Sequence, residues 1–202
     1  MFGATSPIIG QRYRLEYTQS GGSLHYSGAL LDYRRYFMAR PVTVAVRGLH
    51  YGRYGPDSED PRLAPLFLGY STLMRGYEPG SFTVEECQLS VTSTCAQLDD
   101  LVGSRLLITN FEVRAPLVGL FRPSAMYGGV PVEVGVFADA GVAWTSDIKP
   151  SFAGGARDFA RSVGAVIRFN AFGFAIGEVD YVKPIDRPER GWIWQFNLIP
   201  GF

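Results

Sequence analysis

The stretch Val132-Glu133-Val134-Gly135-Val136-Phe137-Ala138-Asp139-Ala140-Gly141 alternates between two kinds of side chain. Its even-numbered positions carry only valine and alanine, whereas its odd-numbered positions carry Glu133, Phe137, Asp139 and glycines. Successive side chains of a β-strand point to opposite faces of the sheet. The stretch therefore predicts a strand with one apolar face and one partly polar face.

The same period of two recurs about eight times along the chain, and helical periodicity is nearly absent. The first run places Tyr13, Leu15 and Tyr17 on one face and charged residues on the other. Breaks rich in Gly, Pro and Asp separate the runs, which predicts an antiparallel meander. The runs cover residues 12–18, 24–36, 42–47, 109–114, 132–141, 162–170, 178–181 and 191–202.

The breaks differ in length in a way that is typical of an outer-membrane barrel. Residues 37–41 and 171–173 form short breaks, whereas 55–103 and 145–160 form long ones. Such barrels have short turns on one side of the membrane and long loops on the other. A loop as long as 55–103 is usually functional. The break at 115–130 is longer than the short-turn side of a barrel predicts.

Two further features favour a membrane barrel over a soluble sandwich. Most runs are close to the length that a tilted strand needs to cross a bilayer, about 9–11 residues. Tyr, Trp and Phe gather at the ends of the runs, as in an interfacial aromatic girdle. The sequence has no continuous apolar stretch of the length that a transmembrane helix requires, about 18 residues. Met1 to Thr5 do not resemble a secretory signal, so we expect an exported chain to have residues before Met1.

Composition and charge exclude some function classes. The formal net charge is zero, which gives no electrostatic reason to expect nucleic acid as a partner. The only histidines, His25 and His50, lack metal-like spacing. His25 lies near Ser23, Ser27 and Asp32, but nothing orders these residues as a catalytic triad. We therefore expect no enzyme activity, no metal site and no cofactor.

Cys87 and Cys95 lie eight residues apart in the long polar loop. No histidine lies near them, so the spacing does not indicate a metal site. In an oxidising compartment they would close a small disulfide ring. Two free thiols are the alternative.

Three motifs give the sequence a family resemblance. The long loop contains Met74-Arg75-Gly76-Tyr77, the cleanest strand contains Phe137-Ala138-Asp139-Ala140-Gly141, and the chain ends on Trp194-Gln195-Phe196-Asn197-Leu198-Ile199-Pro200-Gly201-Phe202. In this order, the motifs resemble the bacterial surface antigen family, the barrel domain of BamA-, TamA- and FhaC-like proteins. That family has an Arg-Gly-aromatic loop motif and a Phe-x-Asp-x-Gly strand motif.

The resemblance covers residues 1–202 as one domain and implies the C-terminal half of a sixteen-stranded transmembrane barrel. The fold it implies is all-β and antiparallel, with about eight strands in this chain. The loop at 55–103 then corresponds to the sixth extracellular loop, which folds back into the lumen. Closure of the eight strands into a small barrel of their own is the alternative, although the long loop would crowd so narrow a lumen.

The resemblance also implies a set of site residues. Arg75, Gly76 and Tyr77 would form the tip of the internal loop, and Arg75 would pair with Asp139 and Glu112 on the lumen face. The alternative places Arg75 in solvent on a surface loop. Small residues such as Gly141 would make room for the loop tip, beside Phe137. The last strand would form a lateral gate through Trp194, Phe196 and Phe202.

The function that the resemblance implies is insertion of outer-membrane proteins or translocation of polypeptides, in the bacterial outer membrane. The expected partners are outer-membrane lipid, client polypeptides and, as further candidates, periplasmic accessory proteins. A barrel that anchors or exports a fused soluble domain is one alternative, and a passive pore is another.

Overall fold

The computed structural model describes residues 3, 5–83, 86–87, 96–122, 131–171 and 175–200. Eight strands form one antiparallel sheet in the order β1-β2-β3-β6-β7-β8-β9-β10. Each strand pairs with the next long strand along the chain, so the sheet is the meander that the sequence predicts. Their bounds are Gly10–Ser20 (β1), Tyr26–Ala39 (β2), Val42–Tyr54 (β3), Arg105–Pro116 (β6), Val132–Trp144 (β7), Ala160–Ala171 (β8), Ala175–Pro184 (β9) and Ile193–Pro200 (β10).

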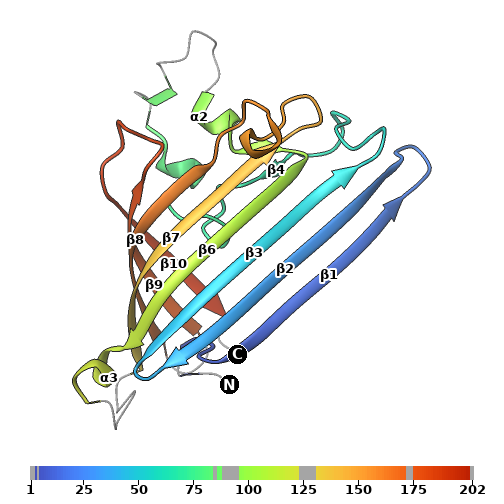
Figure 1. The fold of residues 1–202 in the computed structure, drawn as a ribbon. Coiled ribbons are helices and arrows are strands. Elements are labelled where there is room, and N and C mark those ends of the chain that lie inside the picture. Colours follow the sequence, from blue (N-terminus) through green and yellow to red (C-terminus); the bar gives the residue numbers. More distant parts are fainter. Residues whose placement is uncertain are drawn as a thin grey trace.

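The sheet curves strongly, so that β9 and β10 lie behind the strands of the first half in Figure 1. Within the described residues, β1 and β10 are the two edges of the sheet and do not pair with each other. The fold is thus all-β and antiparallel, and its curvature is that of part of a barrel wall. None of the helices in the described ranges is long and apolar enough to cross a membrane.

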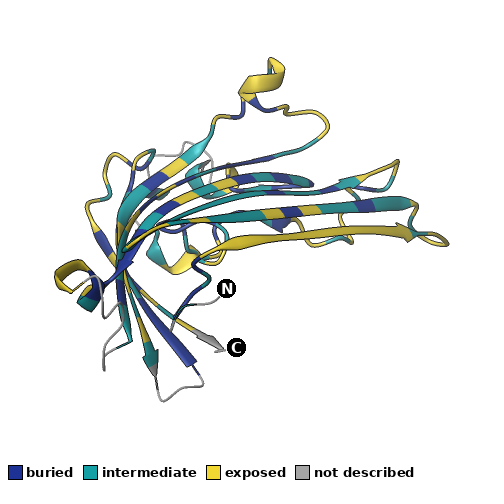
Figure 2. Cartoon of the chain, turned by 60° about the horizontal axis from the view of Figure 1, so that its bottom comes forward, coloured by how far each residue is buried: buried dark blue, intermediate teal, exposed yellow. Residues whose placement is uncertain are grey.

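Residue exposure follows the alternation in the sequence. In β10, Gln195 is 4% exposed and its neighbour Phe196 is 74% exposed, because the two side chains point to opposite faces. Phe137 and Asp139 of β7 are buried, whereas Val136 and Ala138, which alternate with them, are exposed. Edge strand β1 is exposed along nearly all of its length, as Figure 2 shows.

At the end of the sheet next to the long loop, several strands are longer than the sequence predicts. The run predicted to end at Arg47 extends to Tyr54, and the run predicted to begin at Thr109 begins at Arg105. The reason is that the concave face becomes apolar there. Leu49 and Ile108, which are paired across β3 and β6, are buried under the loop. An apolar side chain on the face that is polar elsewhere in these strands removes the alternation on which the prediction depends.

The connections also differ from the predictions. The break at 37–41 is shorter than predicted, since β2 and β3 are separated only by Arg40 and Pro41. The break at 115–130 begins with a short helix, Leu117–Phe121 (α3). The remaining elements lie in the connections predicted as long loops: Leu66–Phe67 (β4), Val102–Gly103 (β5), Pro79–Ser81 (η1), Ala96–Asp99 (α2) and Ser151–Ala153 (η3).

Candidate functional site

The long loop between β3 and β6 folds back over the concave face of the sheet. Its apolar residues Leu68 and Met74 are fully buried, and they join a core with Leu49 and Ile108 of the wall. Burial of such a side chain stabilises a fold by about 1.5–3 kcal/mol. Gly141 provides the space: a Cβ there would lie 2.8 Å from Cδ1 of Leu68. Apolar contacts therefore hold the part of the loop that precedes its tip against the wall.

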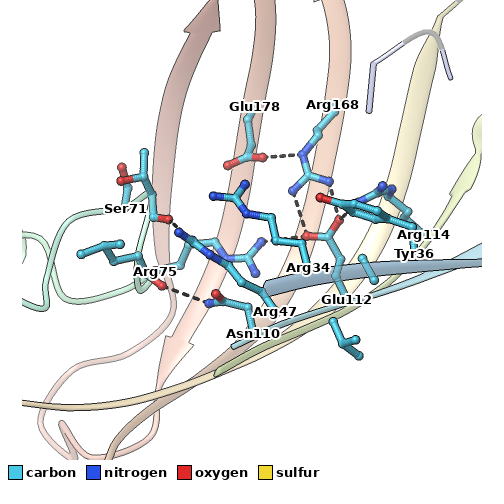
Figure 3. Close-up of a pocket in the computed structure, with 14 residues that line it drawn as sticks. Arg34, Tyr36, Arg47, Ser71, Arg75, Asn110, Glu112, Arg114, Arg168 and Glu178 are labelled. Carbon is cyan, nitrogen blue, oxygen red and sulfur yellow. Dashed lines mark hydrogen bonds and ion pairs between the residues drawn. The ribbon is translucent and has the colours of Figure 1, made fainter. Parts of the chain in front are cut away.

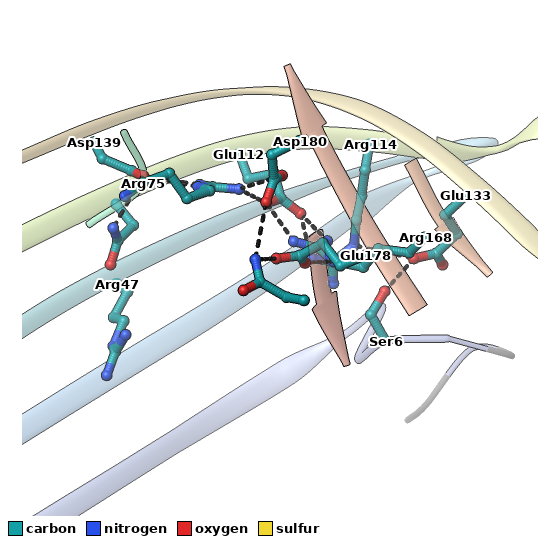
Figure 4. Close-up of polar contacts among 12 residues, drawn as sticks. Ser6, Arg47, Arg75, Glu112, Arg114, Glu133, Asp139, Arg168, Glu178 and Asp180 are labelled. Atoms are coloured by element: carbon teal, nitrogen blue, oxygen red, sulfur yellow. Dashed lines mark hydrogen bonds and ion pairs between the residues drawn. The ribbon is translucent and has the colours of Figure 1, made fainter. Parts of the chain in front are cut away.

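Arg75 at the loop tip binds two carboxylates of the wall, as Figure 4 shows. Its Nε and Nη2 donate to the two oxygens of Asp139 at 2.8 and 2.9 Å, and its Nη1 donates to Glu112 Oε2 at 3.2 Å. The guanidinium carbon also lies 3.4 Å from the ring centroid of Phe137. The structure thus brings together the four residues Arg75, Glu112, Phe137 and Asp139, which we call the Arg75 cluster.

Glu112 connects the loop tip to further arginines of the wall. It accepts hydrogen bonds from Arg114 Nη1 at 2.9 Å and from Arg168 Nη2 at 2.8 Å, besides the bond from Arg75. Arg168 also pairs with Glu178. The sequence places these side chains on polar strand faces, but it does not show which of them meet. The result is a buried network in which one carboxylate accepts hydrogen bonds from three guanidinium groups.

Gly76 and Tyr77 hold the next part of the loop. Gly76 has φ +89°, and a Cβ at this position would lie 2.9 Å from Val182 Cγ1, so only glycine fits without strain. Its amide donates to Gln195 Oε1 at 2.8 Å, which ties the loop to β10. The Tyr77 hydroxyl donates to the carbonyl of Arg161 at 2.8 Å. Burial, together with the nearby Asp186 carboxylate, raises the pKa of Tyr77 to about 12.

A second buried ion pair holds the loop beyond its tip, and no sequence pattern predicts it. Arg187, between β9 and β10, binds Glu86 through two hydrogen bonds of 2.8 Å. Its Nη1 also donates to the Gly76 carbonyl at 2.7 Å, and its guanidinium lies over the Phe82 ring. Both charged side chains are 1% exposed. We call Arg187, Glu86, Gly76 and Phe82 the Arg187 cluster.

The remaining predicted site residues lie apart from these clusters. Trp194 and Phe196 project from the exposed face of edge strand β10, and Trp194 packs against Tyr181. Phe202 lies outside the described residues. Cys87 is disulfide-bonded. Cys95, the other cysteine of the chain, also lies outside the described residues.

The loop contacts should weaken in acid, because they depend on ionised carboxylates. Burial alone would raise the pKa of Glu86, but hydrogen bonds from Arg187 and the Thr83 amide lower it below its usual value. A carboxylate with a lowered folded-state pKa stabilises the fold above its unfolded pKa, about 4.3, and loses that contribution as pH falls through the folded value. We expect hydrogen exchange of residues 76–82, corrected for intrinsic rates, to be constant from neutral pH to about pH 5 and to rise below about pH 4.

Glu86→Gln should remove part of this acid response, whereas Glu78→Gln, a control in the same loop, should retain it. An acid response that is identical in wild type and Glu86→Gln would contradict the assignment to Glu86.

The two clusters join a loop to a wall and do not resemble a reaction centre. His50 Nδ1 donates to the Leu106 carbonyl at 2.8 Å and the ring stacks on Trp144, so both of these contacts are structural. In the described parts of the chain, no group of three or more His, Cys, Asp and Glu side chains is arranged to hold a metal ion. What the arrangement can do is keep an internal loop in one position through buried charge pairs.

The family of the chain follows from comparison with family models. The Omp85 superfamily domain matches residues 7–201, nearly the whole sequence. This superfamily consists of bacterial outer-membrane proteins and includes proteins that insert and translocate polypeptides. A search of curated proteins found no match. The match agrees with the resemblance to bacterial surface antigens and with the antiparallel sheet. The chain belongs to the Omp85 superfamily.

Proposed function

We propose that residues 1–202 supply the C-terminal half of an outer-membrane barrel that inserts outer-membrane proteins or translocates polypeptides. The observation that carries this proposal is the internal loop of an Omp85 chain, held to the wall by the buried Arg75 cluster. Charge pairs of this kind are costly to bury and are weak evidence for stability alone. A fixed loop position inside the barrel is therefore the better reason for their presence.

The exposed face of the sheet supports contact with lipid. Leu15, Val136, Ile167 and Leu198, on four different strands, are all at least 44% exposed. Monomeric soluble proteins rarely expose apolar side chains over so wide an area. The lipid of the outer membrane would cover this face.

The last strand supports a route for client polypeptides. β10 pairs only with β9 among the described strands, so its other edge carries main-chain groups able to bind an added strand. Trp194 and Phe196 are exposed beside this edge. In the proposed function, client strands pair here when the barrel opens, and periplasmic accessory proteins deliver them.

The test is reconstitution of the full-length protein into liposomes with an unfolded β-barrel client. We expect wild-type protein to accelerate either client folding, seen as heat-modifiable migration, or transfer of a polypeptide to a protease-protected lumen. Arg75→Ala should reduce that acceleration, whereas Arg62→Ala, at an exposed arginine of the same loop, should not.

Each other outcome identifies a competing function. Ion conductance without client folding or transfer would overturn the proposal in favour of a passive pore. Liposomes that show no client folding, no polypeptide transfer and no ion conductance would also overturn the proposal. They would favour an anchor or exporter for a fused domain.

A further inference from the structure

A row of arginines crosses the first three strands on the concave face. Arg12 of β1 is directly opposite Arg34 of β2, and Arg34 is directly opposite Arg47 of β3. Residues opposite each other on neighbouring strands have Cβ atoms about 4.5–5.5 Å apart, and like charges in these positions destabilise a sheet. Nearby negative charge would reduce the repulsion between the arginines of such a row.

The protein itself supplies one carboxylate to the two inner arginines of this row. Asp32 accepts from Arg34 Nη2 at 2.7 Å and from Arg47 Nη2 at 3.0 Å. Both arginines also direct their Nε groups to the same carboxylate, at 3.2 and 3.1 Å. On β1 the nearest acid, Glu16, pairs with Arg14. Two guanidinium groups thus share a single negative charge, and the Arg12 charge lies beside them.

Arg34 and Arg47 line a cavity of about 450 Å³ between the wall and the loop (Figure 3). The loop side is formed by Ser71, Thr72 and Leu73, and the Thr72 carbonyl accepts from Arg47 Nη1 at 2.8 Å. The charged side chains that line the cavity are five arginines and two glutamates: Arg34, Arg47, Arg75, Arg114, Arg168, Glu112 and Glu178.

The inner end of the cavity is already neutralised, but the end at β2 and β3 is not. Glu112 binds Arg75, Arg114 and Arg168, so these three are paired with a carboxylate of the wall. Among the described residues, Asp32 is the one carboxylate that pairs with Arg34 and Arg47, and their side chains are 33% and 15% exposed. This end therefore combines open volume with excess positive charge.

We propose that this cavity binds a small oxyanion group, a carboxylate or a phosphate, through Arg34 and Arg47. A guanidinium group binds either oxyanion through two parallel, charge-assisted hydrogen bonds. The volume exceeds the share of one water, about 30 Å³, many times over, so an oxyanion fits with its waters. Because Ser71, Thr72 and Leu73 also line the cavity, the bound group would lie between the wall and the loop. This site does not depend on the proposed function.

The test is ligand-observed NMR on the full-length protein in detergent, with inorganic phosphate and with succinate as separate probes. We expect one or both probes to bind, and Arg34→Gln to weaken binding about tenfold or more, since one of two guanidinium groups is lost. Arg34→Gln leaves Asp32 paired with Arg47, so the sheet keeps its internal ion pair. Binding of phosphate alone would identify a phosphate site, and binding of succinate alone a carboxylate site.

Arg35→Gln is the matched control, because Arg35 is the next residue of the same strand and its side chain is directed to the opposite face, where it binds Gln11. It should bind the probes as wild type does. Should Arg34→Gln fail to fold, Arg47→Lys keeps the charge but loses the two-pronged geometry and should also weaken binding. Absence of binding by both probes, or equal weakening by Arg35→Gln, would overturn the proposal.

Discussion

Arg75→Ala should release the internal loop while the barrel wall stays folded. The substitution removes the cation that Asp139 and Glu112 share, and breaking one partner of a buried ion pair costs about 3–5 kcal/mol. Opening of the loop should then become more than about a hundredfold more frequent. Limited proteolysis of the full-length protein, with cleavage mapped within residues 55–103, measures this directly.

Arg62→Ala is the control for Arg75→Ala, because Arg62 belongs to the same loop but pairs with Asp60 at the surface. Its cleavage rate should stay close to wild type, since exposed pairs contribute little. Arg75→Lys should lie in between, because a lysine keeps the charge without the guanidinium fork. A loop that is equally protected in Arg75→Ala and wild type would show that the apolar contacts of Leu68 and Met74 hold it alone.

Arg187→Met should loosen the part of the loop that follows the tip. It leaves Glu86 buried without its cation, again at a cost of about 3–5 kcal/mol, and it removes the hydrogen bond to the Gly76 carbonyl. Hydrogen exchange of residues 76–82 should rise strongly. Arg190→Met, in the same β9–β10 connection, is the control and should leave this exchange unchanged.

The double variant Arg187→Met with Glu86→Leu separates charge from packing. Replacing both members of a buried pair by apolar side chains is often nearly neutral. The double variant should therefore exchange more slowly than Arg187→Met alone. Faster exchange in the double variant would mean that packing, and not an uncompensated charge, explains the effect of the single substitution.

The sequence predicted the fold where strand alternation is clean. Strand β7 is the best case, since Val136 faces outward while Phe137 and Asp139 are buried beside the loop. Prediction failed where the loop covers the wall, because Leu49 and Ile108 place apolar side chains on the face that is polar elsewhere in their strands. The physical cause of these errors is therefore the loop itself.

The residues of the Arg75 cluster could be predicted from the sequence, whereas those of the Arg187 cluster could not. Arg75 and Asp139 could be named because each stands in a family motif, and Glu112 because strand alternation places it on the same face. Arg187 and Glu86 lie 101 residues apart in two connections without periodicity, so no pattern relates them. The hydrogen bond between Gln195 and Gly76 depends on how far the sheet curves, which strand patterns do not specify. Contacts between a loop and a distant strand depend on how the whole sheet curves, which the pattern of a single strand does not specify.

The most direct test of the account is a double-mutant cycle between Arg75→Ala and Asp139→Asn, measured by loop protection in the full-length protein. Asp139→Asn removes the charge and nearly keeps the shape. Since either change breaks the same ion pair, in which Arg75 donates to Asp139 at 2.8 and 2.9 Å, the two effects should be strongly non-additive, with a coupling energy of about 2–3 kcal/mol. Strictly additive effects would contradict the account, because they would show that Arg75 and Asp139 do not hold the loop together.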